Sequence, residues 1–281
     1  VPPLPEADCT AEAPRLTISV TRLEQLSPTL LELGCPARVY IPLEEVSRLE
    51  SLPGEGPEWC AVLPRVWRDR DESALRTLLE WARALGFTGV LIGNLGHLPL
   101  VRGLNFHLYG DYGLNVFNSR SLAYLKDKEL ESACVSFELR FAQIRDLKKV
   151  LRAEAIVYGR LPLMITENCL VQNETGCRLD RQGPCVPEDG PCRCGQPNVL
   201  VDRTGAAFPL LPAYGHRTEI QNSKPLYLAD RPEHRRLGLA YARLRFTTET
   251  AEECVSVVQN YLDAAPAAGD FTRGLYERGV E

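Results

Sequence analysis

Short runs of apolar and β-branched residues alternate with helix-like patterns along most of the chain, beginning at Leu16. Such alternation is typical of strands that lie side by side in a parallel sheet or barrel and are joined by helices. The runs number eight, which predicts a (β/α)8 TIM-like barrel, with a doubly wound open sheet as the alternative. The predicted strands are Leu16–Val20, Ala37–Ile41, Trp59–Val66, Gly89–Asn94, Phe106–Gly110, Cys134–Leu139, Ala155–Gly159 and Tyr241–Phe246.

Helical periodicity and helix-stop residues fill the segments between these strands. Gly34 and Gly86 are suited to end two of the helices, and Asn118 with Ser119 is suited to begin a third. The predicted helices are Thr21–Leu33, Asp71–Leu85, Arg120–Leu130, Pro225–Leu239 and Thr248–Ala264.

A single interruption of roughly eighty residues follows the seventh predicted strand and is longer than a plain connection in a compact domain. It predicts a cysteine-rich insertion at residues 160–238 that lies over the carboxyl-terminal mouth of the barrel. Within it, Val199–Asp202 and Ala207–Leu211 flank a Thr-Gly turn and predict a β-hairpin. The expected organisation is a leader at 1–14, the barrel at 15–265 and a tail at 266–281, cut as a module from a longer chain.

Composition narrows the class of protein. The 281 residues are 44% hydrophobic and 25% charged, which suffices for a large core. Apolar stretches are short, and no signal-peptide pattern is present, so we expect a cytoplasmic protein without a membrane partner. The net charge of −5 argues against broad coating of nucleic acid.

Five of the ten cysteines fall within one glycine-, proline- and acid-rich stretch, at Cys169, Cys177, Cys185, Cys192 and Cys194. Disulfides suit small secreted domains better than a chain with this much core. A structural zinc site usually has paired Cys-x(2–4)-Cys spacing, which is absent here, whereas an iron–sulfur cluster accepts irregular spacing. Spacing alone leaves zinc and iron–sulfur open. Four other cysteines lie in apolar contexts and are expected in the core: Cys35, Cys60, Cys134 and Cys254.

Polar residues follow several predicted strands and would meet at one end of a barrel. The candidate site residues are Arg65, Asn94, Asn115 and Glu138. The alternative is that the asparagines cap helices and that Glu138 pairs with a nearby arginine. Standard hydrolase motifs are absent from the sequence, which weighs against a peptidase. The arginine-rich segment Arg231–Arg245 would suit RNA phosphates, although a solvated helix face explains its first four basic residues equally well: Arg231, His234, Arg235 and Arg236.

Several segments occur in a characteristic order along nearly the whole chain. They are LPR at Leu63–Arg65, IGNLG at Ile92–Gly96, LNVFNS at Leu114–Ser119, SFELR at Ser136–Arg140, YGRLPLMITENC at Tyr158–Cys169 and FTRGLYERGV at Phe271–Val280, with VDRTGAAFPL and HRTEIQNSKPLYLAD between the last two. Together they resemble the peptidase U32 family of collagenase-like proteins, and in particular a second barrel module of a longer member.

The resemblance implies a barrel and, from several relatives, a 4Fe–4S cluster that supports oxygen-independent hydroxylation of ubiquinone precursors or RNA bases. Prephenate is the implied oxygen donor. The cluster ligands of such relatives map onto Cys169, Cys177, Cys192 and Cys194, with Cys185 as a substitute. The leading hypothesis is therefore hydroxylation of an RNA base. The alternatives are a peptidase, as the family name implies, and a non-catalytic barrel that binds the remaining modules of a longer chain and uses a structural metal site.

Overall fold

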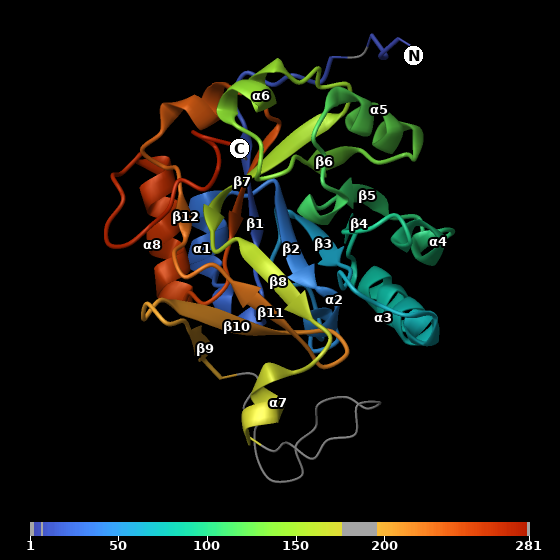
Figure 1. Cartoon of the computed structure of the whole chain (residues 1–281). Coiled ribbons are helices and arrows are strands. Elements are labelled where there is room, and N and C mark those ends of the chain that lie inside the picture. The colour runs from blue at the N-terminus through green and yellow to red at the C-terminus, as the bar shows by residue number, and fades with distance from the viewer. Residues whose placement is uncertain (1–2, 7, 176–195, 280–281) are drawn as a thin grey trace. The chain divides into compact units, whose positions relative to one another are not determined.

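Eight parallel strands form a closed barrel in the computed structural model of the chain (Figure 1), which describes residues 3–6, 8–175 and 196–279. The strands follow one another around the barrel in chain order. They are β1 (Arg15–Ser19), β2 (Arg38–Pro42), β3 (Glu58–Val62), β4 (Gly89–Ile92), β5 (His107–Gly110), β6 (Ser132–Cys134), β7 (Arg152–Gly159) and β13 (Tyr241–Arg245). The predicted (β/α)8 barrel is therefore confirmed, with seven strands close to their predicted places. The sixth strand lies at Ser132–Cys134, and the prediction of Cys134–Leu139 is wrong beyond its first residue, because the chain turns at residues 137–138.

The barrel closes through strands that are far apart in the sequence. β13 lies between β1 and β7, with Tyr241 opposite Arg15 on one side and opposite Glu154 on the other. β6 pairs with the first residues of β7 and completes the ring. The short strand β12 (Leu226–Tyr227) adds antiparallel to the end of β7.

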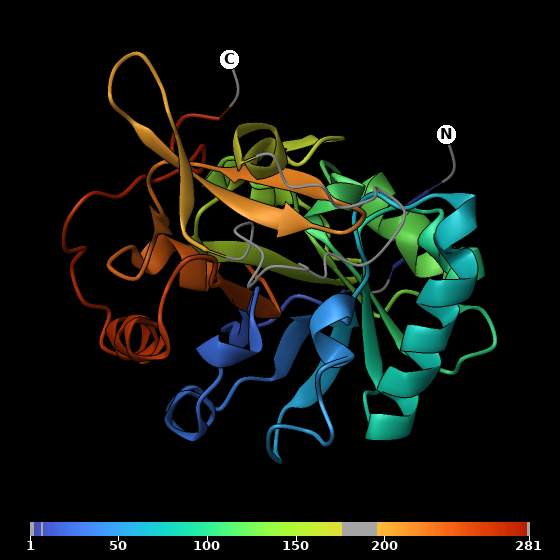
Figure 2. The same ribbon diagram turned by 90° about the horizontal axis from the view of Figure 1, so that it is seen from below.

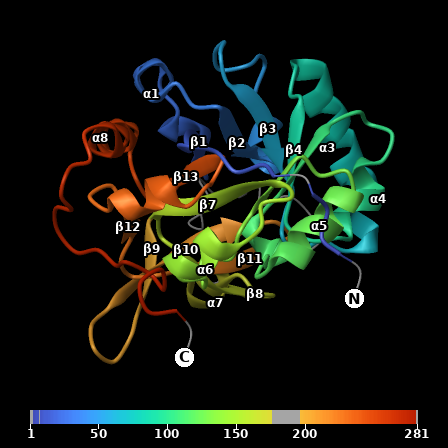
Figure 3. The same cartoon turned by 90° about the horizontal axis from the view of Figure 1, so that it is seen from above.

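Helices surround the strands, as the view down the barrel shows (Figure 3). α3 buries Leu75, Leu79 and Ala82 against the barrel, and α8 begins with a capping box between Thr250 and Glu253. From below, α3 and α8 lie on opposite sides of the ring (Figure 2). The helices of the barrel are α1 (Pro28–Gly34), α2 (Leu43–Val46), α3 (Glu72–Leu85), α4 (His97–Val101), α5 (Ser119–Asp127), α6 (Phe141–Asp146) and α8 (Ala251–Leu262), with 3-10 turns η1 (Leu23–Gln25), η2 (Asp69–Asp71), η3 (Tyr112–Leu114) and η5 (Pro232–Arg236).

Two predicted helices are wrong in part. The helix predicted at Thr21–Leu33 is broken, because Ser27 starts a new helix with its side chain and Pro28 occupies the first helical position. The helix predicted at Pro225–Leu239 is replaced by β12 and η5, since residues 226–227 pair with β7. Among the described part of the chain, no helix has the length and apolar character to span a membrane.

Three of the four expected core cysteines are buried, but the fourth is not. Cys60, Cys134 and Cys254 are fully buried, as predicted. Cys35 is exposed, and the prediction is wrong there, because this residue ends α1 in a left-handed conformation with φ of 35° and so points out of the helix packing.

A second compact unit comprises Arg160–Pro225, while the barrel unit comprises Val1–Gly159 and Leu226–Glu281. The second unit contains a four-stranded antiparallel sheet in the order β8-β11-β10-β9. Its elements are β8 (Pro162–Thr166), α7 (Leu170–Thr175), β9 (Asn198–Val201), β10 (Ala207–Ala213) and β11 (Arg217–Gln221). The predicted hairpin is confirmed as β9 and β10. That this unit covers the barrel mouth stays a prediction.

The end of β7 requires a glycine. Gly159 has φ of +119°, and a Cβ atom there would lie 2.0 Å from the carbonyl oxygen of Arg245 on β13. The two strand ends therefore approach so closely that only a residue without a side chain fits.

Replacing Gly159 by alanine is expected to lower the free energy of unfolding by at least about 2 kcal/mol, because both backbone strain and a clash with main chain are introduced. Gly56→Ala is the matched control, since φ is +110° there and nothing lies within 4 Å of the added Cβ. Urea unfolding measures both. A Gly159→Ala protein no less stable than the Gly56→Ala protein would contradict the close approach.

Candidate functional site

A buried ion-paired network crosses the axis of the barrel. Arg243 on β13 is 1% exposed and donates hydrogen bonds to Asp111 Oδ1 at 2.5 Å and to the carboxylate of Glu154 on β7. Glu154 also accepts hydrogen bonds from the hydroxyls of Thr17 at 2.6 Å and Tyr40 at 3.1 Å. The strands β1, β2, β7 and β13, together with the residue after β5, thus meet in one hydrogen-bonded network around Arg243 and Glu154.

The electrostatics of this network follow from its burial. Burial alone would lower the pKa of Arg243, but the carboxylates of Glu154 and Asp111 outweigh it and hold the pKa well above its usual value. Burial and the nearby Glu154 carboxylate raise the pKa of Tyr40. Arg243 therefore stays charged and Tyr40 stays a neutral hydrogen-bond donor.

A second polar layer lies nearer the amino-terminal ends of the strands. The guanidinium of Arg38 pairs with Glu58 at 3.0 Å and donates to Ser132 Oγ at 2.9 Å and to the hydroxyl of Tyr241 at 3.1 Å. It also lies 3.6 Å from the ring centroid of Tyr109. A stacked ring shields the face of a guanidinium while the edge makes hydrogen bonds, which allows Arg38 to be buried.

At the carboxyl-terminal ends of the strands, Tyr112 is the common neighbour of two arginines. The guanidinium of Arg65, after β3, lies 5.2 Å from the Tyr112 ring centroid, and that of Arg245, at the end of β13, lies 5.8 Å from it. The ring of Phe137, after β6, packs 5.8 Å from Tyr112. Two cationic groups and an aromatic surface therefore gather at the mouth, where barrel enzymes bind their substrates.

His97 fixes the loops that carry Arg65 and Asn94. Its Nδ1 accepts the backbone N–H of Gly93 at 3.2 Å, so the proton is on Nε2, which donates to the carbonyl of Pro64 at 3.1 Å. The Asn94 amide donates to the carbonyl of Arg65 at 3.2 Å. Because His97 is buried, its pKa is lowered to about 4, and it is a neutral positioning group rather than a base at neutral pH.

The four predicted site residues all follow strands at the mouth, and the structure joins two of them. Arg65 and Asn94 are linked through the hydrogen bond just described. Asn115 is exposed and ends η3 with φ of 50°, while Glu138 is half-buried and its backbone N–H is 3.4 Å from Ser136 Oγ. Their convergence on one ligand stays a prediction.

The cysteine stretch lies mostly outside the described residues. Cys177, Cys185, Cys192 and Cys194 all fall there, so the predicted cluster of sulfur atoms stays a prediction. Cys169 is described: it is 7% exposed, directly precedes α7, and its Sγ accepts the backbone N–H of Gln172 at 3.4 Å. In the described ranges, no group of three or more metal-binding side chains comes together.

Sequence reasoning missed the arginines of the barrel interior. Arg243 and Arg245 are 1% and 6% exposed and belong to the barrel interior, and contact of the arginine-rich segment with RNA phosphates stays a prediction. The signal was the alternation in YARLRF, where Tyr241, Arg243 and Arg245 share one side of a buried strand. A further missed group is Glu44, in α2 directly after β2, whose pKa burial raises to about 7.

Arg243→Gln is expected to reduce the free energy of unfolding by about 3–5 kcal/mol, because Asp111 and Glu154 would face each other without a cation. Glu154→Gln should cost less, about 1–2 kcal/mol, since Arg243 and Asp111 remain a balanced pair. Urea unfolding of the two variants and of the double variant tests this. Equal losses in the two single variants would show that the carboxylates do not share the arginine.

The contribution of His97 to the stability of the barrel should fall as the pH drops from about 6.5 to 4, whereas Glu44, whose pKa burial raises to about 7, contributes in the opposite direction. The unfolded chain binds a proton at His97 near pH 6.5, whereas the folded protein binds it only near pH 4, so acid favours unfolding. The difference in the pKa of His97 between the unfolded and folded states corresponds to a loss of about 3 kcal/mol at most in the free energy of unfolding. The His97→Gln substitution should make the free energy of unfolding depend less steeply on pH. Part of the dependence should remain, because burial also lowers the pKa of His234. NMR titration of the His97 ring provides the direct check, and a pKa near 6.5 would contradict the conclusion that burial lowers the pKa of His97.

Comparisons with known proteins bear on the fold and the family. A search of curated proteins finds no match. Among solved structures, the U32 peptidase Mk0906 is 8% identical with a TM-score of 0.45, over 89% of this chain and 98% of that one. A putative deoxyribose-phosphate aldolase from Coccidioides immitis is 12% identical with a TM-score of 0.33, over 55% and 75%. Chitinase ChiW from Paenibacillus is 9% identical with a TM-score of 0.37, over 89% and 33%.

A scan against protein families gives the more specific result. The model of peptidase family U32 matches residues 52–198, which is just over half of the 281 residues. The match includes the loops that carry Arg65, Asn94, Tyr112 and Glu138. The chain therefore belongs to peptidase family U32.

Proposed function

We propose that this U32 barrel binds an anionic substrate at the carboxyl-terminal ends of its strands, through Arg65 and Arg245. The observation that carries the proposal is the placement of both guanidinium groups on the ring of Tyr112. Guanidinium groups bind carboxylates and phosphates through paired hydrogen bonds, and a shared aromatic neighbour restricts where they can point. A carboxylate-bearing donor such as prephenate fits this chemistry.

The reaction proposed is the oxygen-independent hydroxylation of a base in tRNA or rRNA. Unstacked bases bind between aromatic side chains, and Phe117 and Phe137 are partly exposed at the same end of the barrel. Glu138 and Glu44 follow β6 and β2, and either carboxyl group is suited to proton transfer there. Asn94 acts by holding the backbone of Arg65, and Asn115 would contribute an amide at the rim.

A 4Fe–4S cluster is the cofactor proposed, with zinc as the alternative. Of its proposed ligands, Cys169 can be tested for fit: it is 7% exposed, and its sulfur accepts the backbone N–H of Gln172. Cys177, Cys192 and Cys194 would complete the set, with Cys185 as the substitute. Such a cluster supplies electron transfer when bound.

Peptide hydrolysis is the second candidate, and the name of the matching family favours it. The described barrel offers little support for a cysteine nucleophile. Burial raises the pKa of Cys60 and of Cys134, which makes both thiols poor nucleophiles. Burial lowers the pKa of His97 to about 4 and keeps it neutral, and both of its ring nitrogens contact backbone groups.

The proposed function predicts that Arg65→Gln lowers RNA hydroxylation by about tenfold or more, because one charge-assisted contact with the anionic donor is lost. The assay uses cells that lack the chromosomal gene and are complemented with each variant. Hydroxylated nucleosides are quantified by mass spectrometry of total tRNA and rRNA. Arg102→Gln, which removes an exposed arginine from the end of α4, is the matched control and should retain full activity.

Purification without oxygen separates the alternatives. Wild-type protein should contain iron and sulfide, and Cys169→Ser should lose them while the barrel stays folded by circular dichroism. Zinc in their place would support the structural-metal alternative. Release of peptides from gelatin that is lost in Arg65→Gln would favour the peptidase. Full hydroxylation in the Arg65→Gln cells would defeat the proposed site, and a wild-type protein without either activity would favour a partner-binding barrel.

A further inference from the structure

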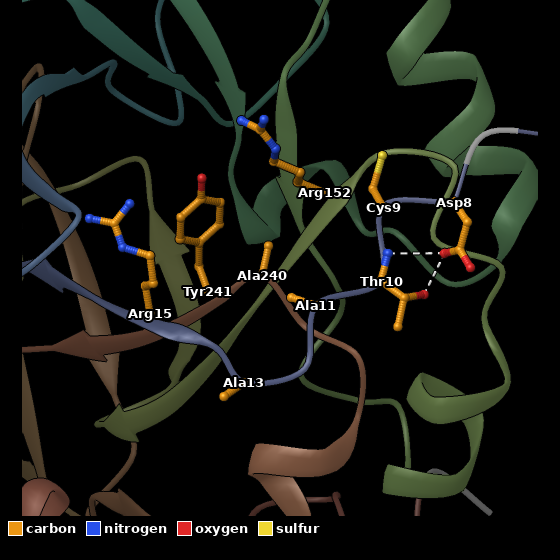
Figure 4. Close-up of a pocket in the computed structure, with 9 residues that line it drawn as sticks. All are labelled: Asp8, Cys9, Thr10, Ala11, Ala13, Arg15, Arg152, Ala240 and Tyr241. Atoms are coloured by element: carbon orange, nitrogen blue, oxygen red, sulfur yellow. Dashed lines mark hydrogen bonds between the residues drawn. The ribbon is translucent and has the colours of Figure 1, made fainter.

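A cavity of about 430 Å³ lies at the amino-terminal ends of the strands, opposite the mouth. Three adjacent strands contribute their first residues to it: Arg15 from β1, Tyr241 from β13 and Arg152 from β7. In the close-up, these three side chains point the same way, and the rest of the wall comes from the segment that carries Asp8, Cys9, Thr10, Ala11 and Ala13 (Figure 4).

The wall is fixed by its backbone. The N–H of Cys9 donates to the carbonyl of Lys149 at 2.7 Å, and the N–H of Ala11 donates to the carbonyl of Gly238 at 3.3 Å. These carbonyls belong to the loops that lead into β7 and β13. The side chains that the wall presents include the small Ala11 and Ala13, so the segment borders the space without filling it.

The charges at the cavity do not balance. Asp8 is the one acidic residue in the lining, and its carboxylate is engaged by the N–H of Thr10 at 2.9 Å and the hydroxyl of Thr10 at 2.5 Å. Neither Arg15 nor Arg152 pairs with a carboxylate in the described part of the chain. Two guanidinium groups therefore face one cavity, and an anion between them would relieve their mutual repulsion.

Tyr241 supplies a third polar group. Its hydroxyl oxygen accepts a hydrogen bond from Arg38 at 3.1 Å, which leaves the hydroxyl hydrogen to be donated elsewhere. Tyr241 is 7% exposed, so its side chain is largely shielded from open solvent.

We propose that this cavity binds a small anionic metabolite that carries phosphate or carboxylate groups. β1 and β7 lie on either side of β13, so the backbones at Arg15 and Arg152 are about 10 Å apart, a separation that two long side chains can bridge onto one ligand. The site is separate from the mouth, because it lies at the other end of the same strands. It does not depend on the proposed function.

Isothermal titration with pyrophosphate and, separately, citrate tests the proposal on the whole chain. At least one probe should bind with a Kd of about 1 mM or tighter, and more weakly at high salt. Arg15→Gln and Arg152→Gln should each weaken binding about tenfold, because each removes a charge-assisted contact. Binding of pyrophosphate alone assigns a phosphate ligand, and binding of citrate alone assigns a carboxylate ligand.

Two controls make the outcome specific. The double variant Arg102→Gln/Arg236→Gln removes two exposed arginines elsewhere in the barrel unit and should bind as the wild type does. Arg65→Gln, which alters the mouth, should also leave this binding unchanged. Wild-type protein that binds neither probe would overturn the proposal, as would equal weakening in the control double variant. Binding lost in Arg65→Gln but retained in Arg15→Gln would assign the anion to the mouth instead.

Discussion

The ion-paired guanidinium of Arg243 is the constraint on which the barrel interior depends. An unpaired charge in a protein core is very costly, and this one is offset by Asp111 and Glu154, which come from other parts of the ring. The three residues are brought together only when β13, which follows the second unit in the chain, takes its place between β7 and β1. Correct insertion of β13 and neutralisation of the core charge are thus the same event.

Aromatic rings accompany each inward-facing arginine. Arg38 lies on Tyr109, Arg243 lies on Tyr40, and the two arginines of the mouth share Tyr112. The flat face of a guanidinium is weakly hydrated, so a ring can replace water there while the edge keeps its hydrogen bonds. Barrels of this type are usually filled by branched aliphatic side chains. Here polar groups extend from one end of the interior to the other, and this places arginines at both openings.

Family membership and the side chains of the barrel interior give different kinds of information about the reaction. Membership of peptidase family U32 assigns the chain to a group of barrel proteins without naming a substrate. The arrangement at the mouth favours an anion, because Arg65 is held through Asn94 and His97 and Arg245 through burial in β13. The proposed cofactor depends on the cysteines that follow Cys169, which lie outside the described residues. Binding of an anion at the mouth and binding of a cofactor by these cysteines can therefore be tested separately.

The sequence by itself determined the number and order of the eight strands, the hairpin at β9 and β10 and the buried state of Cys60, Cys134 and Cys254, because these depend on local periodicity. It located the residues at the strand ends, including Arg65 and Asn94, for the same reason. The helix predicted from the sequence at Pro225–Leu239 is wrong, because pairing of β12 with β7 overrides the helical pattern there. Alternation along β13 shows that Arg243 and Arg245 share a side, but not which side faces the axis. Only ring closure between β13 and β1, which are more than 220 residues apart, decided that.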